Sequence, residues 1–163
     1  MDDLLALCAD LPVRQVAPGE VLLEEGAAAG ALLVLQSGSV VVERGGTPFA
    51  RIDTPGAVFG ELAVVLGVPV TATVRADDEV VVRVAEDPRA FLTERPGAAL
   101  AVLRTTAARL DGLTRYLADV KEQYAGLPGH LGMVDGLLDT LVHHQGPQAR
   151  PGSARDPEGH LGH

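Results

Sequence analysis

The chain has 163 residues, 47% of them hydrophobic and 21% charged, so it can bury the core of one globular domain and is not a disordered chain. Thirteen basic and twenty-two acidic residues give a net charge of −9, and so acidic a surface disfavours direct binding to nucleic acid or to a membrane. With a single cysteine, no basic leader and no apolar run of about 18 residues, we expect a cytoplasmic protein without an internal disulfide.

Short runs rich in Val, Leu, Ile and Thr follow one another through the first half of the chain, separated by Gly, Pro and Asp residues typical of turns. They cover residues 20–24, 31–35, 39–44, 48–53, 71–76 and 79–84. Runs of this length and spacing predict strands of a β-sandwich or small barrel. Residues 60–67 interrupt the series, because they are flanked by glycines and rich in helix formers, and they predict one or two helical turns.

Helical signals follow the last strand. Asp87 and Pro88 form an N-cap followed by a proline at the first helical position, which predicts a short helix. Pro96 opens a longer predicted helix over residues 96–124, which ends before Gly126 and Pro128.

The long helix carries two interleaved sevenfold rows, one of Leu103, Leu110, Leu117 and Tyr124 and one of Thr106, Leu113 and Val120. Such rows are typical of a coiled-coil seam. We favour a homodimer through this helix, because nearly thirty residues exceed the length that a small barrel covers. In the alternative, the same rows pack onto the barrel of their own chain.

The remainder divides into an amphipathic stretch and a tail. Apolar residues between Met133 and Val142 predict a second helix within residues 127–144, which needs a surface to pack on. Residues 145–163 contain almost nothing apolar and predict a disordered tail. The predicted division is therefore a domain over residues 1–126 with its long helix, a short helix and a tail.

The residue types argue against an enzyme. All five histidines follow the long helix, so the barrel holds no imidazole for a metal, and no serine or cysteine has a histidine in a local catalytic motif. His143 and His144 are adjacent and point in different directions on a helix, so they suit a helix C-terminus better than a metal. We expect no metal and no cofactor.

The most specific pattern begins at Phe59 and Gly60, where a glycine turn leads into a helix that begins with Glu61. Free amides at a helix start suit an anion, and a neighbouring carboxylate suits sugar hydroxyls. The pattern predicts a cradle for a sugar phosphate, with a purely structural capped helix as the alternative.

Residues 59–76, FGELAVVLGVPVTATVRA, resemble the phosphate-binding cassette of the cyclic-nucleotide-binding domain family. Residues 17–42, APGEVLLEEGAAAGALLVLQSGSVVV, resemble the first strands of that family, and the similarity covers roughly residues 8–124. The resemblance implies a mainly β fold with flanking helices: an eight-stranded jelly-roll barrel followed by a long C-terminal dimerisation helix.

The resemblance also implies roles for single residues. Gly60 and Leu62 offer backbone groups to the ligand, Glu61 binds the ribose 2′-hydroxyl and Thr71 contacts the phosphate. The other candidate ligand-binding residues are Ala63, Val70 and Ala72 in the cassette, and on the long helix Arg109, matched to a partner of the cassette glutamate, and Thr114, matched to a purine contact.

Val70 departs from the family pattern, which has at this position an arginine that pairs with the cyclic phosphate. Loss of a desolvated bidentate pair of about 2 to 4 kcal/mol weakens binding about 30- to 1000-fold. Arg75 does not replace it, because an odd number of residues along a strand places it on the opposite face, where we expect a surface salt bridge.

The chain also lacks a basic recognition helix after the long helix, so we expect no direct contact with DNA. The first hypothesis is a non-enzymatic sensor of cAMP or cGMP that signals to a partner protein. In the alternatives, the domain binds no cyclic nucleotide and is a dimeric interaction module, or it binds an uncharged nucleoside.

Overall fold

The computed structural model describes residues 3–123 and 131–143. The chain divides into two compact units, a sandwich unit of residues 1–106 and a helical unit of residues 107–163, which are described separately. The long helix α4, Pro96–Gln123, contributes residues to both units.

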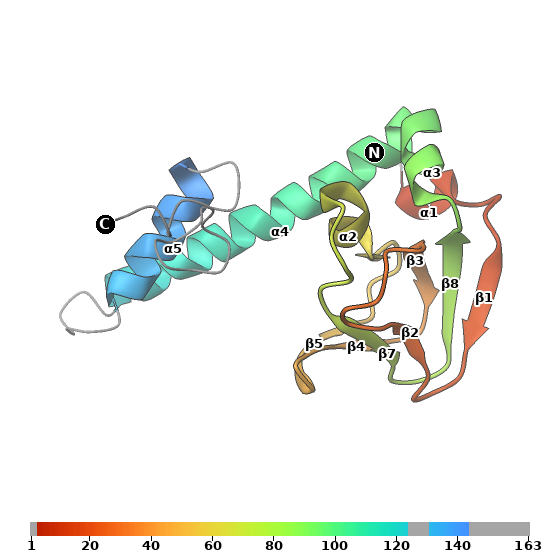
Figure 1. The fold of residues 1–163 in the computed structure, drawn as a ribbon, viewed down its shortest axis with the longest axis horizontal. Helices are drawn as coiled ribbons and strands as arrows, with labels where there is room; N and C mark the ends of the chain where they lie inside the picture. The colour runs from red at the N-terminus through yellow and green to blue at the C-terminus, as the bar shows by residue number, and fades with distance from the viewer. Residues whose placement is uncertain (1–2, 124–130, 144–163) are drawn as a thin grey trace, which may run out of the picture. The chain divides into compact units, whose positions relative to one another are not determined.

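Eight strands of the sandwich unit form two four-stranded sheets in which every pairing is antiparallel (Figure 1). The first sheet has the order β1 (Val13–Val16), β8 (Val80–Ala85), β3 (Leu32–Ser37) and β6 (Val58–Phe59). The second has the order β2 (Val21–Leu23), β7 (Thr73–Ala76), β4 (Val40–Arg44) and β5 (Thr47–Ile52).

The six predicted strand runs correspond to β2, β3, β4, β5, β7 and β8, with ends displaced by one or two residues. The residue pattern did not predict β1, in which three of four residues are exposed, or β6, which has only two residues. The mainly β class is confirmed. The strands form two sheets, and among the described residues no strand pairing joins the sheets into a closed barrel.

The core between the two sheets is aliphatic, as the scarcity of aromatic residues requires. Its single aromatic member is Phe59, at the end of β6. The buried residues of this core are Val16, Leu22, Leu33, Leu35, Val40, Phe59, Val74, Ala76, Val80 and Val82.

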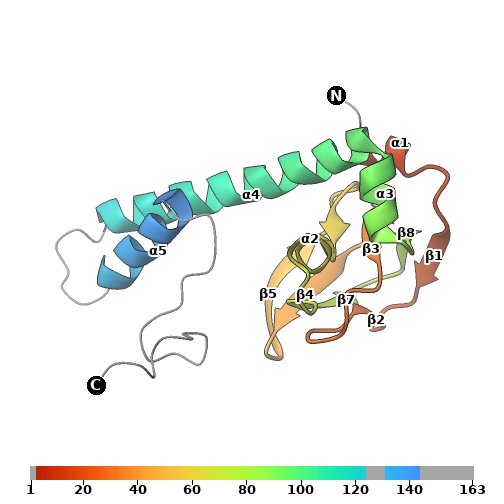
Figure 2. The same ribbon diagram turned by 45° about the horizontal axis from the view of Figure 1, so that its top comes forward.

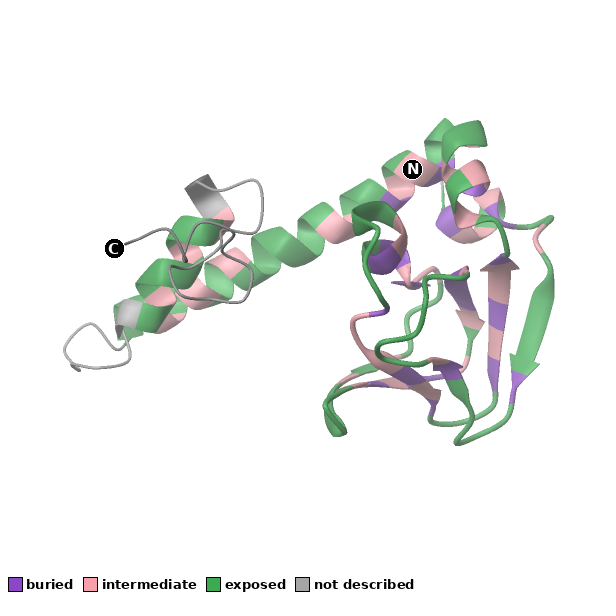
Figure 3. Cartoon of the chain, viewed as in Figure 1, coloured by how far each residue is buried: buried purple, intermediate pink, exposed green. Residues whose placement is uncertain are grey.

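A second core lies on the other face of β3, where helices cover it (Figure 3). Helix α1 (Leu4–Leu7), helix α3 (Pro88–Glu94) and the start of α4 supply Leu4, Phe91, Ala98 and Val102 to it. Because both faces of β3 are covered, its first four residues, Leu32 to Leu35, are all buried and all apolar. The sequence pattern did not predict α1.

Cys8 belongs to this second core and is fully buried. Burial raises the pKa of its thiol to about 11, so the thiol is protonated and unreactive at neutral pH.

The helix signals agree with the structure. The Asp87 carboxylate accepts a hydrogen bond of 3.1 Å from the Ala90 amide, and Pro88 is the first residue of α3. Helix α4 begins at Pro96 as predicted, and its described part ends at Gln123.

The sevenfold rows do not form the surface by which α4 joins the second core. Ala98 and Val102 are buried there, whereas Leu103 is 62% exposed. The alternative in which the leucine row packs onto the chain's own sandwich is therefore wrong for Leu103.

In the helical unit, helix α5 (Leu131–His143) lies beside the C-terminal part of α4 in both ribbon views (Figure 2). Helix α5 corresponds to the second helix predicted within residues 127–144. An ion pair between Lys121 and Asp135 joins α4 and α5. The predicted boundary at residue 126, the tail over 145–163, Tyr124 and His144 lie outside the described residues. None of the described helices has the length and apolarity to span a membrane.

The N-terminal segment is tied to the α3–α4 junction by Arg95. Its guanidinium donates to both carboxylate oxygens of Asp10, at 2.6 and 2.5 Å, and to the Leu7 carbonyl at 3.0 Å. The hydrogen bond from Arg95 lowers the pKa of Asp10 from 3.8 to about 2.

This pair predicts a defined pH dependence of stability. Because the pKa of Asp10 is lower in the folded state, its contribution is complete above about pH 4 and is lost as the pH falls through 2. Asp10→Asn should lower the melting temperature slightly at pH 6, and the difference from wild type should shrink below pH 4 in calorimetric melts. Asp53→Asn, an exposed aspartate beyond β5, is the control. An Asp10→Asn difference that persists unchanged at pH 2 would contradict the assignment.

Candidate functional site

The cassette begins with a turn that requires glycine. Gly60 has a φ of 87°, in the left-handed region, and precedes helix α2, Glu61–Leu66. A Cβ at this position would lie 2.8 Å from the Ala31 carbonyl oxygen, which is backbone and cannot move aside easily. The start of α2 is therefore held close to the start of β3, and only glycine fits between them.

Helix α2 presents its first residues in different ways. The Glu61 side chain is only 5% exposed, and Ala63 is buried beneath the helix, whereas Leu62 is 40% exposed. A carboxylate is rarely buried without a specific partner, because desolvation opposes its charge. Glu61 is thus a buried carboxylate at the start of α2, as expected for a polar binding site at this helix.

The second half of the cassette is held by backbone hydrogen bonds to the loop between β2 and β3. The Val70 amide donates to the Ala27 carbonyl at 2.9 Å, and the Val70 carbonyl accepts from the Gly26 amide at 2.8 Å. The side chain of Val70 is 6% exposed, and Thr71 and Ala72 are partly buried. These bonds use only the peptide groups of residue 70 and not its side chain.

Arg75 is placed as the alternation predicted. Its Nε lies 3.4 Å from Glu43 Oε1, and its Nη1 donates to the Gly19 carbonyl at 2.9 Å. Val74 and Ala76, its neighbours, are buried on the opposite face of β7. The expected surface salt bridge is confirmed.

One contact to the cassette was missed by the sequence reasoning. Arg44, at the end of β4, donates its Nε to the Thr71 carbonyl at 3.0 Å. The strand alternation of Val40, Val42 and Arg44 was a signal that this arginine lies on the core-facing side of the sheet.

The structure brings the seven cassette candidates together on the sandwich unit, whereas Arg109 and Thr114 belong to the helical unit. Thr114 donates its hydroxyl to the Leu110 carbonyl at 2.8 Å within α4. The roles of Arg109 and Thr114 stay predictions.

A groove of about 520 Å³ lies beside α2. Most of its lining is apolar, and Arg89 at the start of α3 is its charged member. It is lined by Ala28, Ala29, Ala63, Val64, Gly67, Val68, Pro69, Pro88 and Arg89. Within residues 3–123 and 131–143, no three His, Cys, Asp or Glu side chains gather where they can hold a metal ion.

The fold and the turn at Gly60 define the class of this protein. It is a β-sandwich in which a short helix, flanked by glycines and beginning with a buried glutamate, is inserted between two strands. The family model of the cyclic nucleotide-binding domain matches residues 13–93. The chain belongs to the cyclic nucleotide-binding domain family.

Solved structures agree with the family match. The N-terminal domain of a transcriptional regulator from Streptomyces coelicolor shares 30% identity, with 69% of this chain and 86% of that chain covered and a TM-score of 0.52. A cAMP-binding acyltransferase from Mycobacterium smegmatis also shares 30% identity, over 67% of this chain and 36% of that chain, with a TM-score of 0.54.

The catabolite activator protein of Thermus thermophilus shares the fold at 22% identity, with 73% of this chain and 59% of that chain covered and a TM-score of 0.60. The chain therefore spans only part of that protein and of the acyltransferase. A comparison with curated proteins finds no match to this sequence.

The turn at Gly60 can be tested against a matched glycine. Gly26 has nearly the same φ, 85°, but nothing lies within 4 Å of a Cβ added there. Gly26→Ala should therefore lower the free energy of unfolding by about 1 kcal/mol, from backbone strain alone. Gly60→Ala adds the contact with the Ala31 carbonyl and should lower it by about 2 to 4 kcal/mol in urea titrations. Equal losses for the two variants would show that the close approach does not constrain the turn.

Proposed function

We propose that this chain is a non-enzymatic regulatory module that binds a cyclic nucleotide at the cassette and signals to a partner protein. The observation that carries the proposal is the start of α2, where the left-handed Gly60 delivers a buried Glu61. In this proposal the Glu61 carboxylate accepts from the ribose 2′-hydroxyl. The backbone at Gly60 and Leu62 and the hydroxyl of Thr71 contact the ligand phosphate.

The family match supports this proposal, as does the similarity to the Mycobacterium smegmatis protein, a cAMP-binding acyltransferase. In this proposal a change of ligand occupancy at α2 is passed to α3, which lines the same groove as α2 and packs on the sandwich. In this proposal the cassette recognises the nucleotide, and the helices pass the signal to the partner protein.

Val70 favours a second candidate, an interaction module that binds no cyclic nucleotide. The position carries a buried apolar side chain in place of the family's arginine. Its backbone is held by bonds to Gly26 and Ala27, and these bonds involve no ligand. Isothermal titration of the purified protein with cAMP, cGMP and adenosine separates the two candidates, and a nucleoside-only sensor would bind adenosine but not cAMP.

Restoring the arginine is the sharper test. Val70→Arg should tighten binding of cAMP by at least about tenfold, because a guanidinium supplies a bidentate partner for the phosphate. Glu61→Ala in the same background should weaken binding again, and melting curves check that both variants fold. If Val70→Arg folds and binds no cyclic nucleotide, the interaction module is the better description.

The long helix completes the proposal as a homodimer interface over residues 96–124. Leu103 and Leu110 of one sevenfold row and Leu113 of the other are 62%, 46% and 49% exposed, and a second copy of the helix would cover them.

Charging this row should separate the copies without unfolding the chain, since both altered side chains are exposed. Leu103→Asp with Leu110→Asp should give monomers by sedimentation equilibrium at tens of micromolar, the concentration at which wild type should be a dimer. Val13→Asp, at a position on β1 that is 50% exposed, is the control for adding charge at an exposed apolar residue. A wild-type protein that sediments as a monomer would disprove the interface.

A further inference from the structure

The position of Arg44 suggests that the missing cation of the cassette comes from another strand. Arg44 is the last residue of β4, and it follows Val40 and Val42, whose side chains are buried in the core. The extra residue that disturbs this part of the sheet belongs to β5, because Val42 and Glu43 pair with Ala50 and Pro48. The alternation along β4 is therefore intact, and it places Arg44 on the same face as Val40 and Val42, exposed at the end of the strand.

The guanidinium of Arg44 is fixed at the cassette. Its Nε donates to the Thr71 carbonyl at 3.0 Å, across 27 positions of the chain. Thr71 directly follows Val70, so the positive charge lies beside the position where the family carries its arginine. Arginine has five donors in a planar fork, and one is used here, which leaves the others to bind an oxyanion.

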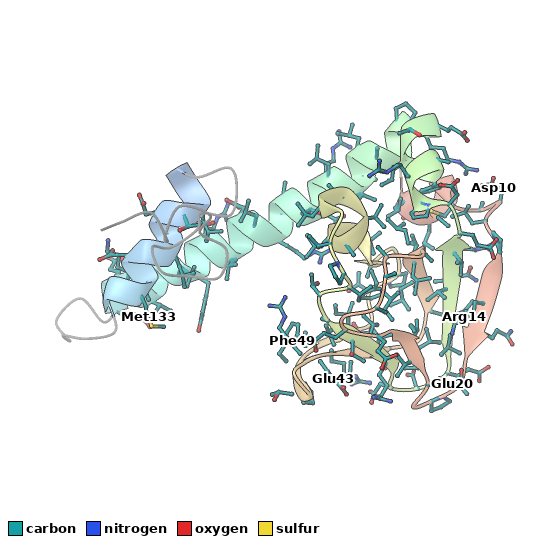
Figure 4. The ribbon with its side chains drawn as sticks, in the orientation of Figure 1. Asp10, Arg14, Glu20, Glu43, Phe49 and Met133 are labelled. Carbon is teal, nitrogen blue, oxygen red and sulfur yellow. The ribbon has the colours of Figure 1, made fainter. Side chains whose placement is uncertain are left out.

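The β4–β5 hairpin that carries Arg44 is held in place by a hydrogen bond from the next residue, Gly45. The Gly45 amide donates to Glu25 Oε2 at 2.8 Å, and the Glu25 amide donates to the Thr73 hydroxyl at 3.0 Å. These bonds join the β4–β5 hairpin, the loop after β2 and strand β7 at the end of the cassette. Figure 4 shows this hairpin between the labelled residues Glu43 and Phe49.

The partner of Arg44 differs in charge from those of three other arginines of the sandwich unit. Arg51, Arg75 and Arg95 each pair with a carboxylate, those of Asp77, Glu43 and Asp10. The Thr71 carbonyl that Arg44 contacts has no formal charge, so this contact does not neutralise the guanidinium. A positive charge beside the cassette suits a ligand with one negative charge.

We infer that Arg44 provides the cationic contact to the phosphodiester of the bound nucleotide, in place of a cassette arginine. This inference rests on the proposed function, because it names the residue that recognises the anionic part of the same ligand. It explains how a cassette with Val70 retains affinity for a charged ligand. It also predicts that Arg44 distinguishes a cyclic nucleotide from the uncharged nucleoside.

The test measures binding of cAMP and of adenosine by isothermal titration to wild type, Arg44→Gln and Arg14→Gln. Arg14 is an exposed arginine on β1, in the other sheet, and controls for the loss of one positive charge (Figure 4). Arg44→Gln should weaken cAMP binding about tenfold or more and change adenosine binding less than about twofold. Arg14→Gln should leave both affinities unchanged. The double variant Arg44→Gln with Val70→Arg should bind cAMP again.

The other outcomes separate this inference from the proposed function. If wild type and Arg44→Gln bind cAMP equally, Arg44 is not the phosphate contact, and the proposed function stands. If Arg44→Gln weakens cAMP and adenosine alike, the arginine only supports the hairpin, and the inference is wrong. If neither wild type nor Val70→Arg binds any of the nucleotides, the proposed function fails and the inference fails with it.

Discussion

The close approach of Gly60 to the Ala31 carbonyl is the constraint on which the site depends. It joins the start of the inserted helix α2 to the start of β3, the strand at the centre of both apolar cores. A left-handed glycine at this point turns the chain sharply from β6 into α2, so the next residue, Glu61, is delivered into a buried position. Any side chain at position 60 would force these backbones apart.

In the cassette, the backbone hydrogen bonds at residue 70 are independent of the side chain that would contact a ligand there. Val70 is held by two hydrogen bonds between its own peptide groups and the loop at Gly26 and Ala27. Neither bond uses the side chain, so valine in place of arginine keeps both of them and removes a charge from the site. A domain of this family can in this way keep its fold while its affinity for an anionic ligand changes by orders of magnitude.

Helices cover one side of the sandwich because β3 is apolar on both faces. Leu33 and Leu35 pack between the sheets, and Leu32 and Val34 pack against α1, α3 and the start of α4. The helical layer is thus part of the sandwich unit's core, and α3 also lines the groove beside α2. In the proposed function, this packing connects nucleotide binding with the surface that a partner reads.

The amino-acid sequence by itself determined the elements with strong local signals. Six strands follow from alternating or continuous apolar runs, α2 from its flanking glycines, and α3 from the Asp87 and Pro88 cap. The cassette candidates from Gly60 to Ala72 were also readable, since they are nearly contiguous and one motif contains them. Strands β1 and β6 and helix α1 were not, because segments of two to four residues are stabilised by pairing with β8 and β3 or by the second core rather than by their own pattern.

Only the tertiary structure decided which side chains from other strands reach the cassette. The contact between Arg44 and Thr71 depends on the register of β4 against β7, which is not encoded within a few neighbouring residues. The burial of Glu61 likewise depends on where α2 docks, beside the carbonyl of Ala31. Local periodicity arises from contacts within one turn or one strand, whereas charge placement at this site arises from contacts across 27 or more positions of the chain.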